Sequence, residues 1–297
     1  MHKNSGAEKI YIFDTTLRDG AQSANISFSV HDKISLIERF DDIGIDYIEV
    51  GFPASNPKDE ELFGILKKKK LNYSRVVAFG RTKHKNIAAD SDDNLKALID
   101  SGADALCIFG KSSSFHVNRV IETTPEINLE MIFDSVKYLK KHSTEVIYDA
   151  EHFFDGYKLD SGYSIKTLIA ARDGGADYIV LCDTNGGSLP GELLEIVTEV
   201  SKVIDTPLGL HCHNDSGCAV ANSILAVERV AGVKMIQGTV NGYGERCGNT
   251  DLCQVIPCLE LKLARRCLPA GNLKHLTNLS RFVSETANQT IAGSQPF

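Results

Sequence analysis

The feature that most constrains this chain is an eightfold alternation of short apolar runs with longer amphipathic stretches. The apolar runs are nearly continuous, as expected for parallel strands that are covered on both faces. The stretches between them have helical apolar spacing, and several end in glycine, the usual residue just past a helix C-terminus. The runs are "IYIFD" from Ile10, "YIEVGF" from Tyr47, "RVVAFG" from Arg75, "ALCIFGK" from Ala105, "EVIYDAE" from Glu145, "YIVLCDT" from Tyr178, "LGLHCHN" from Leu208 and "MIQGTVN" from Met235.

Eight strand-then-helix units in 297 residues predict an α/β fold, a (β/α)8 TIM barrel, with a doubly wound open sheet as the alternative. We expect residues 1–9 to be a disordered lead and residues 10–265 to form the barrel. Residues 266–297 lose the strand–helix rhythm and read as a short helical extension, where a linker or C-terminal subdomain would begin. The polar tail of this extension indicates that the chain is a fragment of a longer protein.

Charge and cysteine content exclude several classes of protein. A formal net charge of −7 gives no reason to expect binding to nucleic acid or to anionic membranes. There is no signal-peptide pattern and no apolar run of membrane-spanning length. The 8 cysteines are scattered without CxxC spacing, so we expect reduced thiols in a cytoplasmic protein.

The stretch "HCHND" places two histidines one residue apart on a predicted buried strand. Alternate side chains of a strand share a face, so His211 and His213 point together. Two adjacent imidazoles suit a shared metal ion, but taken alone they could equally be a pair satisfied by hydrogen bonds.

Polar residues at the ends of other predicted strands favour the metal interpretation. In a barrel, the C-terminal ends of the strands form one rim, and charges there are costly unless they are paired or ligated. Asp19, just after the first strand, is the best candidate for a third ligand. This donor set suits Zn, Mn, Co or Fe better than Ca and admits Mg weakly. Arg18 beside it offers a fork to a carboxylate or a developing oxyanion. The other polar residues at this rim are Glu49, Glu151, His152, Asp183 and Thr184.

The glycine run "NGYGERCGN" follows the eighth strand and superficially suggests a dinucleotide fingerprint. The glycine spacing and the late position in the chain do not fit that motif. We expect these glycines to let the backbone approach a ligand, with Glu245 and Arg246 paired inside the site.

Three motifs from separate parts of the chain, "FDTTLRDGAQ", "HCHND" and "TVNGYGERCGN", resemble a superfamily of metal-dependent TIM barrels. Its members make or break carbon–carbon bonds beside a carbonyl and include 2-isopropylmalate, homocitrate and citramalate synthases and hydroxymethylglutaryl-CoA lyase. Four further segments, "VVAFGRTKH", "IFGKSSSFHV", "YDAEHFFDGYK" and "VLCDTNGGSLP", most resemble the citramalate synthases, which condense acetyl-CoA with pyruvate in isoleucine biosynthesis.

The resemblance implies a role for individual residues. It makes Asp19, His211, His213 and Asn249 ligands of a divalent metal (Mn, Mg or Zn). Arg18 would bind the 2-oxo acid and steady its oxygen, Thr184 would hold the substrate carboxylate, and Glu151 would complete the Asp-Arg-Glu signature. Glu151 or Glu245 would be the general base. The resemblance also implies acetyl-CoA as co-substrate and a homodimer.

Other functions remain open from the residues alone. The 2-oxo acid could be 2-oxoisovalerate or 2-oxoglutarate, and we expect Phe79, Ile108 and Tyr148 to set the pocket size that decides this. Tyr148 and His152 are candidate substrate contacts, as is His116. A lyase of the same superfamily fits less well, and a non-catalytic metal-binding module is the alternative from a different class.

Overall fold

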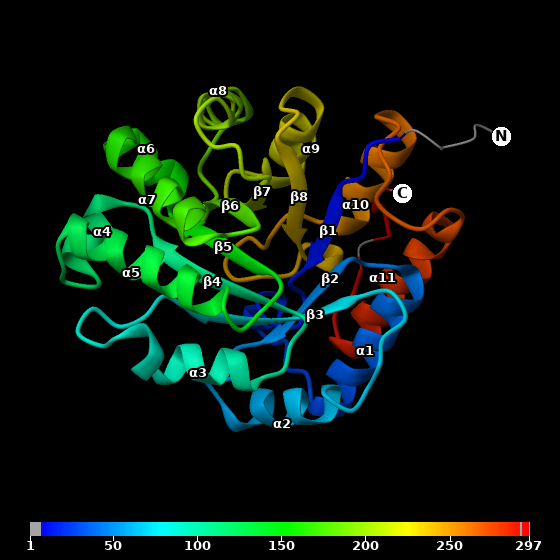
Figure 1. Cartoon of the computed structure of the whole chain (residues 1–297). Coiled ribbons are helices and arrows are strands. Elements are labelled where there is room, and N and C mark those ends of the chain that lie inside the picture. The colour runs from blue at the N-terminus through cyan, green and yellow to red at the C-terminus, as the bar shows by residue number, and fades with distance from the viewer. Residues whose placement is uncertain (1–6, 292, 297) are drawn as a thin grey trace.

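The computed structural model describes residues 7–291 and 293–296 and shows eight parallel strands closed into a barrel (Figure 1). β1 pairs with both β2 and β8, which closes the sheet. This confirms the predicted TIM barrel and excludes the open sheet. The strands are β1 Tyr11–Asp14, β2 Tyr47–Gly51, β3 Arg75–Arg81, β4 Ala105–Lys111, β5 Val146–Glu151, β6 Tyr178–Asp183, β7 Leu208–Cys212 and β8 Val233–Gly238.

Helices surround the barrel and cover the outer face of the sheet (Figure 1). Two connections carry an additional helix at the C-terminal ends of the strands: α4 after β4 and α6 after β5. The helices are α1 Val30–Ile43, α2 Pro57–Leu66, α3 Asp93–Asp100, α4 Ser114–Arg119, α5 Pro125–Leu139, α6 Phe153–Leu159, α7 Ser161–Gly174, α8 Pro190–Ser201, α9 Ala219–Arg229, α10 Leu252–Pro257 and α11 Leu276–Thr286. Short turns of helix are η1 Gly20–Gln22, η2 Ala89–Ser91, η3 Val240–Gly242, η4 Cys258–Lys262 and η5 Asn272–His275.

The two-residue repeat of each strand divides its side chains between the barrel interior and the helix layer. The interior cluster contains Phe13, Tyr47 and Ile147, whereas Ile48 and Tyr148 belong to the outer core under the helices. The rings of Tyr11, Tyr47 and Tyr178 pack edge to face at the N-terminal ends of their strands. Polar side chains occupy the C-terminal half of the interior, which is the half that a TIM barrel uses for function.

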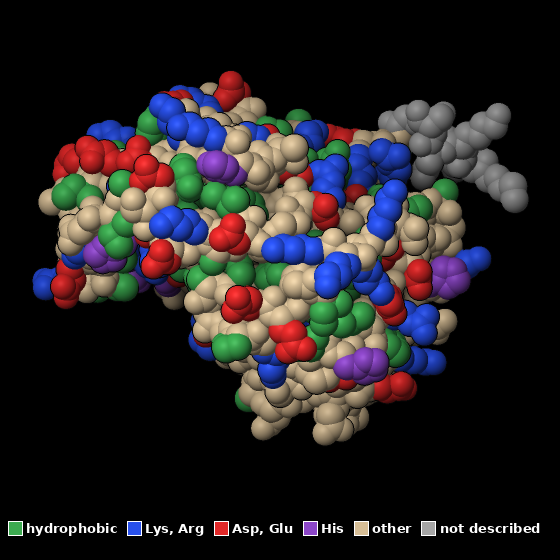
Figure 2. Space-filling view, turned by 60° about the horizontal axis from the view of Figure 1, so that its bottom comes forward, with side chains coloured by type: hydrophobic (Ala, Val, Ile, Leu, Met, Phe, Trp, Pro, Cys, Tyr) green, Lys and Arg blue, Asp and Glu red, His purple; other side chains and the backbone are tan. Residues whose placement is uncertain are grey.

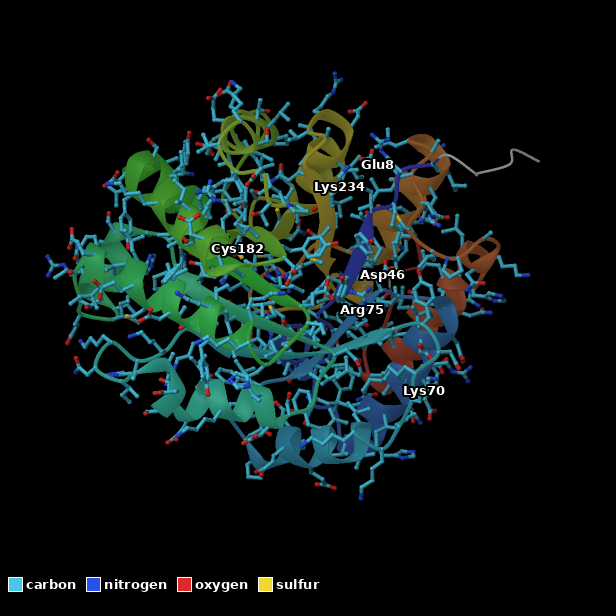
Figure 3. The ribbon with its side chains drawn as sticks, in the orientation of Figure 1. Glu8, Asp46, Lys70, Arg75, Cys182 and Lys234 are labelled. Carbon is cyan, nitrogen blue, oxygen red and sulfur yellow. The ribbon has the colours of Figure 1, made fainter. Side chains whose placement is uncertain are left out.

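Both ends of the described chain pack on the barrel. Lys9 forms a parallel β-bridge with Arg266 and an ion pair of 2.7 Å with Asp46. Glu8 is paired with Lys234 at the start of β8, and the two labels lie together in Figure 3. The prediction that residues 1–9 are disordered is therefore wrong for Glu8 and Lys9, because these contacts fix their positions. Residues 1–6 lie outside the described chain. Within the expected extension, α11 packs against α1 and η3.

Figure 2 shows one face of the molecule, on which basic and acidic side chains are interspersed. None of the described helices is both long and apolar enough to cross a membrane.

Candidate active site

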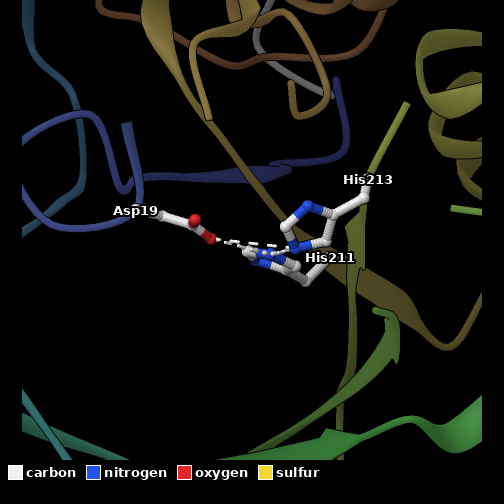
Figure 4. Close-up of side chains that lie close together, drawn as sticks. All are labelled: Asp19, His211 and His213. Atoms are coloured by element: carbon white, nitrogen blue, oxygen red, sulfur yellow. Dashed lines mark hydrogen bonds and ion pairs between the residues drawn. The ribbon is translucent and has the colours of Figure 1, made fainter. Parts of the chain in front are cut away.

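Asp19, His211 and His213 converge at the C-terminal end of the barrel (Figure 4). Asp19 Oδ2 lies 3.2 Å from His211 Nε2 and 3.9 Å from His213 Nε2, and the two imidazole nitrogens are 3.3 Å apart. Ligand atoms that each lie about 2.1 Å from one ion are separated by about 3–3.5 Å. The three side chains are thus spaced to hold one metal ion between them, and all three are buried.

The protonation states also suit ligation. Burial opposes charge on Asp19, but Arg18 and the two histidines outweigh burial and keep the pKa of this carboxyl below its ordinary value. Burial and the neighbouring His211 lower the pKa of His213 to about 3, so its ring is neutral near pH 7. A carboxylate and a neutral imidazole are the forms that bind a metal.

Gln237 fixes the orientation of His211. Its Oε1 lies 2.9 Å from His211 Nδ1, and its Nε2 donates to Asp149 Oδ1 at 3.0 Å. Since the amide oxygen can only accept, His211 Nδ1 carries a proton, and Nε2 is the ring nitrogen that faces Asp19. Burial opposes charge on His211, but the Asp19 carboxylate outweighs burial and raises the pKa of this imidazole, so a metal ion bound at Nε2 would displace a proton. Neither Gln237 nor Asp149 was predicted from the sequence; the pairing of β7 with β8 places Gln237 beside His211.

Asn249 is held beside His213 by an isolated β-bridge between the two residues. Its Nδ2 donates to the carbonyl of Tyr243 at 3.0 Å, and its buried Oδ1 has no hydrogen-bond partner within the described residues. The turn that carries it is tight, because a Cβ on Gly248 would lie 2.1 Å from the carbonyl oxygen of Gly242. An unpartnered buried oxygen at this position fits the predicted fourth ligand.

Arg18 lies between the metal cluster and an aromatic wall. Its Nε donates to Glu49 Oε1 at 2.6 Å, its Nη1 is 3.7 Å from Asp19 Oδ2, and its guanidinium is 3.8 Å from the centre of the Phe79 ring. Glu49 is fully buried on β2, and burial raises the pKa of its carboxyl to about 7. Glu49 was predicted to lie at the rim, but its pairing with Arg18 was not predicted.

Glu151 and Glu245 lie on the wall of the same pocket but have other partners. Glu151 forms an ion pair with Lys111 of β4. Glu245 accepts from Arg246 Nη1 at 2.8 Å, as expected, and Arg246 also binds Asp215. In this structure the glutamate that contacts Arg18 is therefore Glu49. The roles expected of Glu151 and Glu245 stay predictions.

The pocket above the cluster has a volume of about 940 Å³ and brings together most of the predicted residues. A volume of this size is typical of a pocket for small organic ligands. The predicted residues that line it are Arg18, Asp19, Phe79, Glu151, Thr184, His211, His213 and Glu245.

Two expected pocket residues lie elsewhere. Tyr148 and Ile108 belong to the fully buried outer core, between the sheet and the helices. They face away from the pocket because Asp149 and Glu151 on β5, and Phe109 on β4, have the opposite parity and face inward. The prediction that Tyr148 contacts substrate and that Ile108 sets the pocket size is corrected: Phe109 takes that place beside Phe79, with ring centres 5.4 Å apart.

Comparison with known proteins identifies the family. The HMGL-like family model matches residues 9–283. The chain belongs to the HMGL-like family. It is 54% identical to (R)-citramalate synthase of Geobacter sulfurreducens over 279 residues, covering 94% of this chain and 52% of that protein. It is 35% identical to the probable 2-isopropylmalate synthase of Methanopyrus kandleri, covering 98% of this chain and 56% of that protein.

Solved structures show the same fold at low identity. The HMG-CoA lyase of Bacillus subtilis superposes with a TM-score of 0.80 at 18% identity, covering 95% of both chains. The chain spans about half the length of the curated synthases it matches.

Proposed function

We propose that this chain is the catalytic barrel of an acyltransferase that condenses acetyl-CoA with pyruvate to give (R)-citramalate and CoA. The observation that supports it most directly is the convergence of Arg18 with Asp19, His211 and His213 in one pocket. A binding module would need the metal ligands alone, whereas a buried cation beside them provides for a charge that develops during a reaction. The 54% identity to a citramalate synthase supports this choice of substrates.

Asp19, His211, His213 and Asn249 would hold a divalent metal, Mn, Mg or Zn. When bound, the ion supplies Lewis acidity to the ketone of the 2-oxo acid. The three separations among Asp19, His211 and His213, the orientation of His211 Nε2 toward Asp19 and the unpartnered Oδ1 of Asn249 support this ligand set.

The chain's own residues then bind and orient the substrates. The hydroxyl of Thr184 donates to the substrate carboxylate, and the Arg18 guanidinium donates to the ketone oxygen as that oxygen gains negative charge. A carboxylate, Glu151 or Glu245, takes a proton from the acetyl methyl group, and the resulting enolate carbon attacks the ketone carbon. Water then cleaves the thioester and releases CoA, which makes the condensation effectively irreversible.

The shape of the pocket supports a small 2-oxo acid. The rings of Phe52, Phe79 and Phe109 pack on one another beside Arg18, with centre-to-centre distances of 6.1 and 5.4 Å. A methyl group fits against such a wall more easily than the branched side chain of 2-oxoisovalerate. One methylene changes the free energy of discrimination by only about 1–3 kcal/mol, so we expect measurable side activity.

The test combines binding with turnover. Mn²⁺ should raise the thermal midpoint of the chain, and pyruvate should raise it further. A ligand at a hundred times its dissociation constant adds about 2.7 kcal/mol of stability. CoA release from acetyl-CoA should depend on pyruvate. Asp19→Asn should remove the response to both ligands, whereas Asp93→Asn, at a fully exposed carboxylate, should leave it intact.

A larger response to 2-oxoisovalerate or 2-oxoglutarate would move the substrate assignment to the corresponding synthase. A response to metal and to no acid would overturn the enzymatic proposal. The homodimer and the cytoplasmic location also remain proposals from the resemblance, and light scattering of the purified chain tests the first.

A further inference from the structure

His152, just after β5, has an unusual backbone for its residue type. Its φ of 55° and ψ of 34° lie in the left-handed region, and it forms the N-cap of α6. Such a conformation is unfavourable for a residue other than glycine and persists only where the surroundings determine it. The surroundings of His152 therefore indicate what maintains the conformation.

The imidazole of His152 stacks on that of His116 from α4, with ring centres 3.9 Å apart and planes inclined by 14°. The ring of Phe115 packs edge-on against His116 at 5.4 Å. Below the stack, α6 is pressed against the end of β4, since a Cβ on Gly156 would lie 2.5 Å from the carbonyl oxygen of Ser112. The stack and this close packing both adjoin the left-handed turn at His152.

Both rings are suited to stacking because they are uncharged near pH 7. Burial, together with the neighbouring His116, lowers the pKa of His152 to about 4, and burial lowers the pKa of His116 as well. The charged groups that face the pair are Lys111, Glu151 and Asp155. Two imidazolium rings at 3.9 Å would repel, so neutrality stabilises the arrangement.

The backbone conformation aims the N–H of His152 at the site. This N–H donates to Thr184 Oγ1 at 2.8 Å, and the carbonyl of Thr184 accepts from Arg246 Nη2 at 2.7 Å. A hydroxyl that accepts a backbone N–H keeps its own proton to donate elsewhere. Thr184 lines the pocket, whereas His152 lies behind it and is not among its lining residues.

We propose that His152 is a positioning residue: its left-handed backbone, braced by the stack on His116, directs the Thr184 hydroxyl proton toward the carboxylate of the bound 2-oxo acid. This inference rests on the proposed function for the identity of the acid. It replaces the expectation that the His152 ring touches substrate with a role of its backbone, and it gives His116 the role of the brace.

Four variants separate the brace, the backbone and the ring. His116→Ala removes the stack and His116→Phe keeps a flat ring in place. His152→Ala disfavours the left-handed region, whereas His152→Asn removes the ring but favours that region. His142→Ala is the matched control, because it removes a histidine that packs on Tyr138 at the far end of α5.

The first readout is the pyruvate dissociation constant measured at saturating Mn²⁺ by titration of the thermal midpoint. If only a fraction of the molecules hold the Thr184 hydroxyl in the binding orientation, the apparent affinity for pyruvate is reduced to that fraction of its full value. His116→Ala and His152→Ala should weaken pyruvate binding about tenfold, as expected for a lost hydrogen bond to a charged group. His116→Phe and His152→Asn should stay within about threefold. The Mn²⁺ affinity should be unchanged in all four, which also shows that they fold.

The second readout needs no substrate. Amide hydrogen exchange of His152 reports its bond to Thr184 directly. It should accelerate in His116→Ala and in Thr184→Val, and remain unchanged in His142→Ala. Equal pyruvate affinity in His152→Ala and wild type, unchanged exchange in His116→Ala, or a defect in His152→Asn as large as that in His152→Ala would overturn the inference. If the wild-type protein binds no 2-oxo acid, the proposed function is overturned, and with it the claim that Thr184 faces such an acid. Amide hydrogen exchange of His152 would still decide whether His116 and the His152 backbone position Thr184.

Discussion

Gln237→Leu tests whether the second layer of the site prepares His211 for a metal. Gln237 is fully buried and joins His211 Nδ1 at 2.9 Å to Asp149 Oδ1 at 3.0 Å. Leucine has a similar size but neither accepts nor donates, so His211 is free to rotate and to protonate Nε2 instead. Loss of such an outer partner lowers metal affinity about 10–100-fold, or about 1.4–2.7 kcal/mol.

The assay is calorimetric titration of the chelator-treated chain with Mn²⁺. The metal-free variant should also unfold more easily, by about 1–3 kcal/mol, because two buried polar groups lose their partner. This loss is measured separately in denaturant. Asn272→Leu is the control, since Asn272 donates to the carbonyl of Ile43 at the end of α1, away from the cluster. Mn²⁺ affinity in Gln237→Leu equal to that of wild type would refute the claim that this amide selects the tautomer of His211.

Three further predictions follow from other parts of the structure. Glu49→Ala should lower the free energy of unfolding by about 3–5 kcal/mol, because it leaves Arg18 buried without its main partner. Glu38→Ala, which removes an exposed ion pair, should lower it by less than about 1 kcal/mol. Urea unfolding measures both. Burial raises the pKa of Asp14 to about 7, so the folded state holds this proton up to pH 7 while the unfolded state loses it near pH 4. The free energy of unfolding of the wild type should therefore fall, relative to Asp14→Asn, as pH rises from 4 to 7, and a constant difference would contradict this. Gly248→Ala should destabilise the fold and weaken Mn²⁺ binding far more than Gly271→Ala. Both glycines have φ near 89°, but only a Cβ on residue 248 would clash with backbone. Thermal unfolding with and without Mn²⁺ measures both effects.

The barrel could be predicted from the sequence because each of its strands is a buried apolar run of distinct length and composition. The metal cluster could also be predicted, since two alternate histidines and a carboxylate at the ends of buried strands form a donor set typical of a metal site. The misplacement of Tyr148 was avoidable: once Glu151 is taken as inward, the two-residue repeat puts Asp149 inward and Tyr148 outward.

The pairs that orient these residues could not be predicted in the same way. The contact between Gln237 and His211 depends on the register of β7 against β8, and that between Arg18 and Glu49 depends on how the loop after β1 folds back over β2. Neither leaves a pattern along the chain. The left-handed backbone of His152 is likewise set by packing on His116, 36 residues earlier in the sequence.

The division of the barrel interior explains why the site lies where it does. In the N-terminal half, Phe13 stacks on Tyr47 at 5.7 Å, so this layer stabilises the fold by apolar burial. In the C-terminal half, burial raises the pKa values of the Glu49 and Asp149 carboxyls, so ionising them in this layer carries a desolvation cost. A barrel that needed only stability would fill both halves with apolar side chains, because well-packed apolar groups can replace a buried ion pair without loss of stability. The polar layer is therefore best explained by the chemistry of the pocket above it.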